Sequence, residues 1–188
     1  GQYEQYLSAL AGVPHTVTRL DAAVDTSEDF PIVLRSLRRR YPAGLVSFSR
    51  KALRVTELLA VRARDGVSTG TWYAGHRAKA KVTARVYDKQ NEVLDRTGVD
   101  SETRTRYELT FRKAMGVTLK DASMPTSLFY QHSRVVGLSP PAGVEPWASH
   151  DLGGWTPVPA VSDLSLSHFS RRVETSPEIQ HLSLIHIS

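Results

Sequence analysis

Three segments of the chain alternate between apolar and polar residues, and this pattern constrains the fold more than any other feature. They are TVTRLDAAVD (16–25), AKVTARVY (80–87) and RTRYELTFRK (104–113). Because successive side chains of a β-strand point to opposite faces, each segment predicts a strand with one apolar and one charged face. The pattern favours an α+β fold with a central antiparallel sheet, helices on its apolar face, and a polar face opposite.

The charged faces of these strands carry the candidate reactive groups. Parity places Asp21 and Asp25 on one strand, Tyr87 on the next, and Glu108 on the third. If the three strands are neighbours, these side chains can converge. Any single alternating strand carries Arg, Lys and Glu on its wet side, so one strand alone indicates nothing. Three strands that each carry a carboxylate or a tyrosine among Arg and Lys are harder to explain by solvent exposure alone.

Other patterns predict the elements between these strands. Ser27 is a candidate N-cap for a helix that runs through PIVLRSLRRR (31–40) and stops before Pro42. Short strands are expected near 45–49, 54–64 and 69–74, with Asp65-Gly66 as a hairpin turn. Asp88 is expected to cap a helix over 89–95, and 118–130 reads as helical or irregular.

The C-terminal part of the chain has a different texture. Five of the ten prolines lie between 140 and 159, and proline lacks the N–H that a central strand needs. We therefore expect a catalytic domain over 1–138, a Pro-rich cover or tail over 139–181, and a non-native tail over 182–188, where LSLIHIS resembles a translated sequencing adaptor. The chain begins at Gly1 inside a helical pattern, so we expect an N-terminally truncated domain.

Composition narrows the class of partner. The net charge is +5, and nine Lys or Arg but one acid, Glu57, lie between 35 and 64. Clustered positive charge favours a nucleic-acid partner, although a solvated cationic face explains it equally well. The absence of cysteine excludes disulfides and thiolate metal sites. No segment reaches the roughly 18 to 20 apolar residues of a membrane span.

The residue types on the polar strands suit phosphodiester cleavage. A tyrosine can attack phosphorus and keep the phosphate as a covalent ester, once cations favour its phenolate over the neutral form with a pKa near 10. Arg85 and Lys89 flank Tyr87 on the same face, and we expect these two cations to favour its phenolate. Asp21, Asp25 and Glu108 are candidate ligands for a hard divalent ion such as Mg²⁺ or Mn²⁺. The chain has no P-loop, no closely spaced histidine pair and no Gly-x-Ser-x-Gly elbow. The residues expected to hold DNA are Arg38, Arg39, Arg40, Arg77, Lys79, Lys81 and Arg106.

Four motifs in order resemble the Rep_trans class of rolling-circle replication initiators, which occur in small plasmids, filamentous phages and integrative elements. They are TRLDAAVD (18–25), WYAGHR (72–77), ARVYDKQNE (84–92) and TRYELTFR (105–112). The resemblance implies a fold like that of other single-strand nickases, with carboxylates in place of a histidine metal pair. It implies that Tyr87, in Tyr87-Asp88-Lys89, is the nucleophile and that Glu108 is a metal ligand. Asp21 and Asp25 both match the aspartate positions, and which of them binds metal is left open.

The resemblance also implies an activity and its partners. We expect a metal-dependent enzyme that nicks one DNA strand at an origin through a 5′-phosphotyrosyl intermediate, for rolling-circle replication. Its partners would be single-stranded or cruciform origin DNA, a host helicase and a second copy of the chain, with no membrane, in the cytoplasm of a bacterial host. The alternative is a non-catalytic module that binds single-stranded DNA or RNA through the same sheet.

Overall fold

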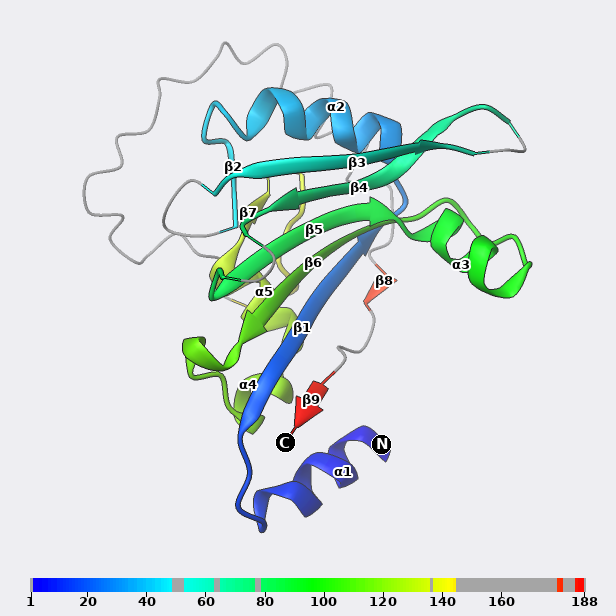
Figure 1. Ribbon diagram of the computed structural model, residues 1–188. Coiled ribbons are helices and arrows are strands. Elements are labelled where there is room, and N and C mark those ends of the chain that lie inside the picture. The colour runs from blue at the N-terminus through cyan, green and yellow to red at the C-terminus, as the bar shows by residue number, and fades with distance from the viewer. Residues whose placement is uncertain are drawn as a thin grey trace.

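The structure is a computed structural model that describes residues 2–48, 53–62, 65–76, 79–135, 137–144, 179–180 and 185–187. Five strands build the body of the molecule (Figure 1). In chain order the elements up to residue 97 are α1 (Gln2–Ala11), β1 (Val17–Thr26), α2 (Phe30–Arg40), β2 (Val46–Ser47), β3 (Val55–Val61), β4 (Ser68–Ala74), β5 (Val82–Asp88) and α3 (Lys89–Thr97). They are followed by β6 (Thr105–Arg112), a 3-10 turn (Lys113–Met115), α4 (Leu119–Ala122), α5 (Pro125–His132), β7 (Arg134–Val135), β8 (Ile179–Gln180) and β9 (Ile185–Ile187).

The sheet is antiparallel throughout and follows the order β3-β4-β5-β6-β1-β8, with β9 also on β1. The three alternating segments are thus neighbours, as β5, β6 and β1. Strands β2 and β7 form a separate two-stranded ladder. The predicted α+β class with a central antiparallel sheet is confirmed.

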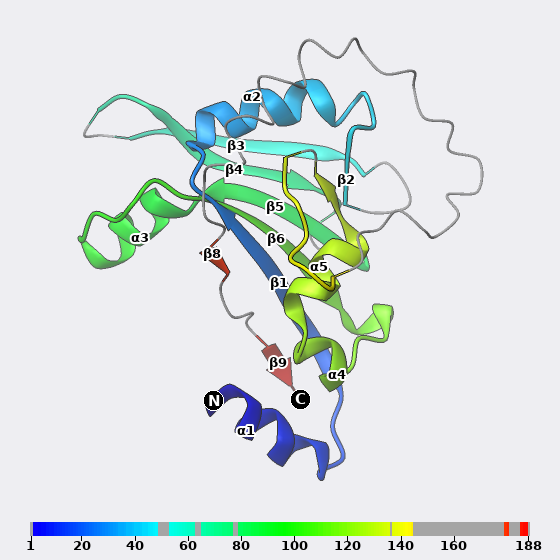
Figure 2. The ribbon, with the colours of Figure 1, turned by 180° about the vertical axis from the view of Figure 1, so that it is seen from behind.

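One face of the sheet is the core. Its strands contribute the alternate apolar residues that parity predicted, including Leu20, Val86 and Phe111. Helices α4 and α5 lie on this side (Figure 2), and α2 packs there through Phe30, Val33 and Leu37. Among the described elements, no helix lies across the opposite, polar face (Figure 1).

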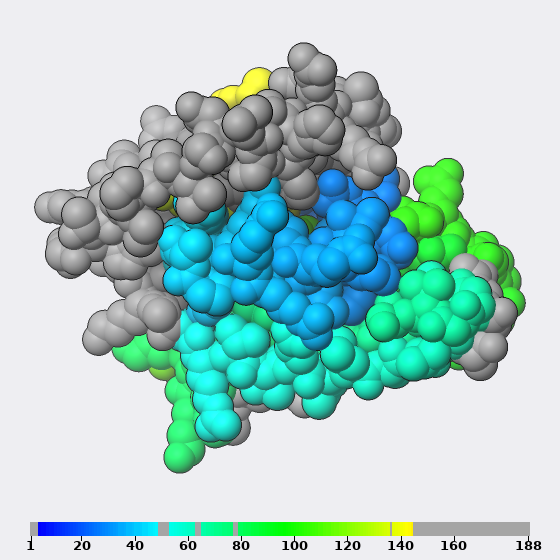
Figure 3. All heavy atoms as spheres, turned by 90° about the horizontal axis from the view of Figure 1, so that it is seen from above, coloured from blue at the N-terminus to red at the C-terminus, as the bar shows by residue number. Residues whose placement is uncertain are grey.

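Helix α2 begins two residues later than the sequence predicted. Its N-cap is Asp29, without a side-chain cap hydrogen bond, and a proline follows in the first turn. Proline has no N–H, so a helix tolerates it only in the first turn, where no intrahelical N–H bond is needed. The helix therefore begins close to its proline, and the predicted cap, Ser27, lies outside it. Figure 3 shows α2 beside the β3–β4 strands, where Arg38 of the helix pairs with Glu57 of β3 at 2.6 Å.

The corner between β5 and α3 is built as predicted. Asp88 ends β5 and caps α3, since its Oδ1 accepts a hydrogen bond from the backbone N–H of Asn91 at 2.9 Å. Its Oδ2 accepts one from the Thr69 hydroxyl at 2.8 Å and lies 3.6 Å from Nη1 of Arg62. The helix ends at Gly98, whose φ of 70° is in the left-handed region that glycine adopts freely. This corner fixes the strand residue next to it, Tyr87.

Most of the predicted Pro-rich segment and C-terminal tail lies outside the described residues. Within them, β8 and β9 pair with β1, and the domain boundaries stay predictions. No helix in the described part of the chain has the length and apolar character needed to cross a bilayer.

Candidate functional site

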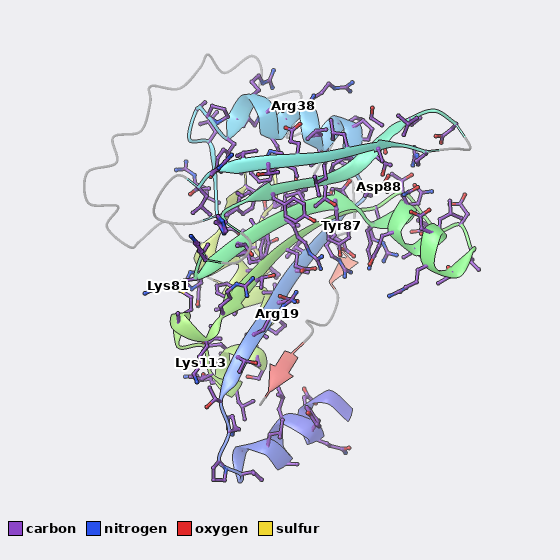
Figure 4. All side chains as sticks on the ribbon, in the orientation of Figure 1. Arg19, Arg38, Lys81, Tyr87, Asp88 and Lys113 are labelled. Atoms are coloured by element: carbon purple, nitrogen blue, oxygen red, sulfur yellow. The ribbon has the colours of Figure 1, made fainter. Side chains whose placement is uncertain are left out.

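The polar face of β5, β6 and β1 brings together the candidate reactive residues. Because antiparallel partners share a face, the register defines rows of side chains across the three strands. One row contains Tyr87, Arg106 and Asp25, and the next contains Arg85, Glu108 and Ala23. A third row contains Thr83, Thr110 and Asp21. Figure 4 shows Tyr87 at the end of β5 that leads into α3.

Tyr87 lies in the row nearest to α3. The Arg85 guanidinium is 4.9 Å from the centroid of its ring and Lys89 Nζ is 5.9 Å from it, which are cation–π distances. The Tyr87 hydroxyl donates to Oε2 of Glu108 at 3.4 Å, a long hydrogen bond. The residue is 7% exposed, although no described helix crosses this face, because neighbouring side chains cover it.

The surroundings of Tyr87 stabilise its neutral form. Burial raises the pKa of the Tyr87 phenol well above its ordinary value, and the Glu108 carboxylate raises it further. Arg106 and Arg85 lower this pKa, but by less. Arg85 acts in the predicted direction, but burial and Glu108 outweigh it in the protein without DNA, and the effect of Lys89 stays a prediction.

Each predicted metal-binding carboxylate is paired with an arginine. Glu108 accepts from Nε and Nη2 of Arg85 at 2.7 and 2.9 Å. Asp25 accepts from the same two atoms of Arg106 at 2.6 and 2.9 Å. These are bidentate pairs, the strongest geometry for arginine and carboxylate. Asp21 is paired in the same way with Arg19, at 2.6 and 3.0 Å.

This pairing decides how the site fits a divalent ion. Asp21 and Asp25 flank Ala23, and Ala23 is the cross-strand partner of Glu108, so the three carboxylates do occupy adjacent positions. Their oxygens, however, are directed to arginines, and no group of three or more Asp, Glu or His among the described residues is arranged to hold a metal ion. As placed, the three carboxylates pair with arginines, and the metal site stays a prediction.

Lys89 occupies the first turn of α3. Its side chain pairs with Glu92, three residues later on the same helix, while its ammonium stays near the Tyr87 ring. The predicted proximity of Lys89 to Tyr87 is present. Its charge, like that of Arg85, has a carboxylate partner.

The predicted DNA-contacting residues fall into different environments. Arg39, Lys79 and Lys81 are exposed, and Arg38 is exposed but paired with Glu57. Arg106 is half-buried in its pair with Asp25, and Arg77 lies outside the described residues.

Arg40 corrects the sequence prediction. It is 3% exposed, so its guanidinium does not lie on the surface that was expected to hold DNA. It follows the buried Leu37 by three residues, which places it on the inner face of α2. Burial lowers its pKa, and the nearby Tyr107 and Glu28 oppose that effect. Consecutive residues of a helix point in different directions, and three of them point around most of one turn. Three arginines in a row therefore cannot all face outward.

No role for Arg19 or Arg62 was predicted from the sequence. Arg19 pairs with Asp21 two residues away on the same strand face, and that spacing was a usable signal. Arg62 reaches Asp88 across the sheet, and nothing local in the sequence indicates that contact.

Comparisons with known proteins find similarity only to solved structures. No protein-family model matches the chain, and no curated protein matches it. Three chains of solved structures match. One of them, described as a rolling circle replication initiator protein from Geobacillus stearothermophilus, is 18% identical with a TM-score of 0.49. The match covers 91% of this chain and 61% of that one. At this level of likeness, functional inference rests on the residues of the chain itself.

Proposed function

We propose that this chain is the catalytic part of a replication initiator that nicks a single DNA strand, with Tyr87 as the nucleophile. The observation that carries the proposal is the position of Tyr87 on the polar sheet face. There it has an arginine, a lysine and a carboxylate around one phenol. The four sequence motifs that resemble Rep_trans initiators support the same role for this tyrosine. The setting we propose is the cytoplasm of a bacterial host.

The proposed reaction is a transesterification. The Tyr87 oxygen forms a bond to the scissile phosphorus, the bond from phosphorus to the 3′ oxygen breaks, and water protonates that leaving oxygen, while the hydroxide so formed takes back the proton that Glu108 received. The phenol proton passes to Glu108, whose Oε2 is 3.4 Å from the hydroxyl. The resulting 5′-phosphotyrosyl ester retains the bond energy that later rejoins the strand.

Arg85 and Arg106 would neutralise the phosphate during this step. Both lie in the rows that contain Tyr87 and its neighbour Glu108, and a phosphate accepts the same bidentate pair of hydrogen bonds as a carboxylate. Binding of DNA would thus exchange part of the carboxylate pairing for phosphate pairing. The resemblance implies Mg²⁺ or Mn²⁺ as a cofactor, which would supply further positive charge to the phosphate.

A covalent-adduct assay tests this function. The full chain is incubated with a labelled single-stranded origin oligonucleotide and Mg²⁺ or Mn²⁺, and the adduct is resolved by denaturing electrophoresis. We expect Tyr87→Phe to form no adduct while it binds the oligonucleotide as the parent does. Tyr73→Phe is the matched control. Tyr73 is the cross-strand partner of Arg85 on β4 and therefore lies on the same face as Tyr87. An adduct formed by Tyr87→Phe would refute the assignment.

A second candidate function is strand binding without cleavage. The raised pKa of Tyr87 and its burial favour this reading, because both oppose nucleophilic attack. A binding module would form no adduct with any variant, and its affinity would fall with salt but not respond to metal.

A further inference from the structure

We propose that Tyr73 and Leu58 form a nucleobase platform beside Tyr87, on which the base of a nucleotide that adjoins the scissile phosphate packs. This inference rests on the proposed function. It assigns the part of the site that receives the base, whereas Arg85 and Arg106 are assigned to the phosphate.

Tyr73 lies next to Tyr87 on the neighbouring strand. It is the cross-strand partner of Arg85, and the residues on either side of it, Trp72 and Ala74, belong to the core. Alternation along β4 therefore directs Tyr73 to the polar face. Tyr87 follows Arg85 by two residues, so the two tyrosines are diagonal neighbours at about 7 to 8 Å. Tyr73 is half-buried, which leaves part of its side chain open to solvent on this face.

Leu58 continues this surface on β3, the next strand of the sheet. It is the cross-strand partner of Thr71, and Thr71 is the partner of Tyr87. The preceding residue, Glu57, pairs with helix α2, which packs on the core side, so alternation directs Leu58 to the polar face. The Leu58 side chain is 52% exposed. An exposed aliphatic group and an aromatic ring thus occupy diagonal positions, Leu58 on β3 and Tyr73 on β4.

The polar face changes character across Tyr87. On the side of β6 and β1, the row of Tyr87 and the row of Arg85 contain the charged residues Arg106, Asp25 and Glu108. On the side of β4 and β3, the same two rows contain only uncharged residues, which are Thr71, Leu58, Tyr73 and Thr56. No helix of the described part of the chain covers this side of the sheet (Figure 1).

A nucleotide is divided in the same way, into an anionic phosphate and an uncharged, planar base. A phosphate at Tyr87 that is held by Arg85 and Arg106 leaves its base free to lie over β4 and β3. Bases of a single strand stack on aromatic side chains, and every base has a π-face that can do so. The platform would therefore favour single-stranded over duplex DNA and accept any base.

Two fluorescent oligonucleotides of about 12 nucleotides test the platform by anisotropy. One is oligodeoxythymidine, and the other has the same number of phosphates on abasic deoxyribose. Every protein is the full chain with Tyr87→Phe, so cleavage does not enter the measurement. We expect Tyr73→Ala to weaken binding of oligodeoxythymidine about tenfold, the loss of stacking on one base, and to leave the affinity for the abasic strand unchanged.

Two further readouts separate stacking from phosphate contacts and from misfolding. The slope of log affinity against log salt should be the same in Tyr73→Ala and in the reference protein, because no phosphate contact is removed. Tyr73→Phe keeps the ring and should bind both strands as the reference protein does. Circular dichroism checks that each variant keeps the fold.

Leu58→Ala and Leu59→Ala form a matched pair. The two leucines are adjacent on β3 and are 52% and 50% exposed, but alternation directs them to opposite faces of the sheet. We expect Leu58→Ala to weaken binding of oligodeoxythymidine about threefold through lost apolar contact. Leu59→Ala should leave it unchanged.

The proposal is overturned if Tyr73→Ala weakens binding of both strands equally or of neither. Equal effects of Leu58→Ala and Leu59→Ala would overturn it as well, and so would a reference protein that binds the abasic strand as tightly as oligodeoxythymidine. Failure of the parent chain to form an adduct would reject the proposed function but leave a base-dependent affinity standing. Adduct formation together with equal affinities for the two strands would reject the platform alone.

Discussion

Tyr87 has polar neighbours but little exposure to solvent, and the pH dependence of stability should reveal its burial. Burial raises the pKa of Tyr87 and also that of Tyr107, which lies in the core. In the unfolded chain both phenols ionise near pH 10. Their folded-state pKa values are higher, so their contribution to stability is complete below pH 10 and is lost as the pH rises further.

We therefore expect the free energy of unfolding to fall above pH 10. Each of the two tyrosines should contribute about 1.4 kcal/mol per pH unit until its folded-state pKa is reached. Urea unfolding between pH 8 and 11.5 measures this slope, and Tyr107→Phe should reduce it. Tyr6→Phe is the control, because Tyr6 is 54% exposed. An identical slope in Tyr107→Phe and in the parent would contradict the burial argument.

Parity was sufficient to place the site residues on one face, but not to predict their partners. The sequence placed Tyr87, Glu108 and the two aspartates together because alternation in a strand has a fixed period of two. It could not tell that Arg85 faces Glu108, because cross-strand register depends on how distant segments align. The charge of Arg85 was consequently expected to act on Tyr87 alone. The burial of Arg40 was not predicted for a related reason. Which face of a helix is buried depends on the segments that pack against it, and these are distant in the sequence.

At the scale of elements, the corner from β5 to α3 holds Tyr87 in place. Asp88 caps the helix and also accepts a hydrogen bond from Thr69 on β4. We expect Asp88→Ala to lower the free energy of unfolding by about 1 to 3 kcal/mol, from the lost cap and the unpaired buried groups. Adduct formation should slow as well, because the neighbouring tyrosine loses its support.

Thr118→Ala provides the comparison for this corner. Thr118 caps α4 through a reciprocal hydrogen-bond pair with Asp121, and it lies outside the polar face. Its loss should destabilise the chain by about 0.5 to 2 kcal/mol and leave the rate of adduct formation unchanged. Chemical unfolding and single-turnover cleavage separate the two effects. Equal slowing in both variants would mean that Asp88 acts through stability alone.

For the whole molecule, the sequence predicted β1 to β6 but not their order, and it predicted none of β7, β8 and β9. Local alternation identified β1, β5 and β6, and turn residues identified the short strands between them. The placement of β1 beside β6 joins segments about 80 residues apart, and no local pattern encodes such a pairing. Hydrophobic parity required only that each apolar face be buried, which several strand orders would satisfy.

The strand order predicts the effect of truncation. A chain that ends at residue 100 keeps β1 and β5 but loses β6, the strand between them. We expect it to be unfolded, because both strands would lose a hydrogen-bonded edge and the core would lose Leu109 and Phe111. Far-ultraviolet circular dichroism and heat-induced unfolding compare it with the full chain. A cooperative transition in the shortened chain would contradict this view of the sheet.

The adjacency of the first and last long strands also affects how the chain is made. During synthesis β1 emerges early and must wait for β6 before its central ladder forms. Until then its backbone groups and its apolar residues, Leu20 and Val24 among them, are open to other chains. Unpaired strands of this kind promote aggregation and favour chaperone binding. Slow, long-range pairing thus makes yield in expression sensitive to temperature and synthesis rate.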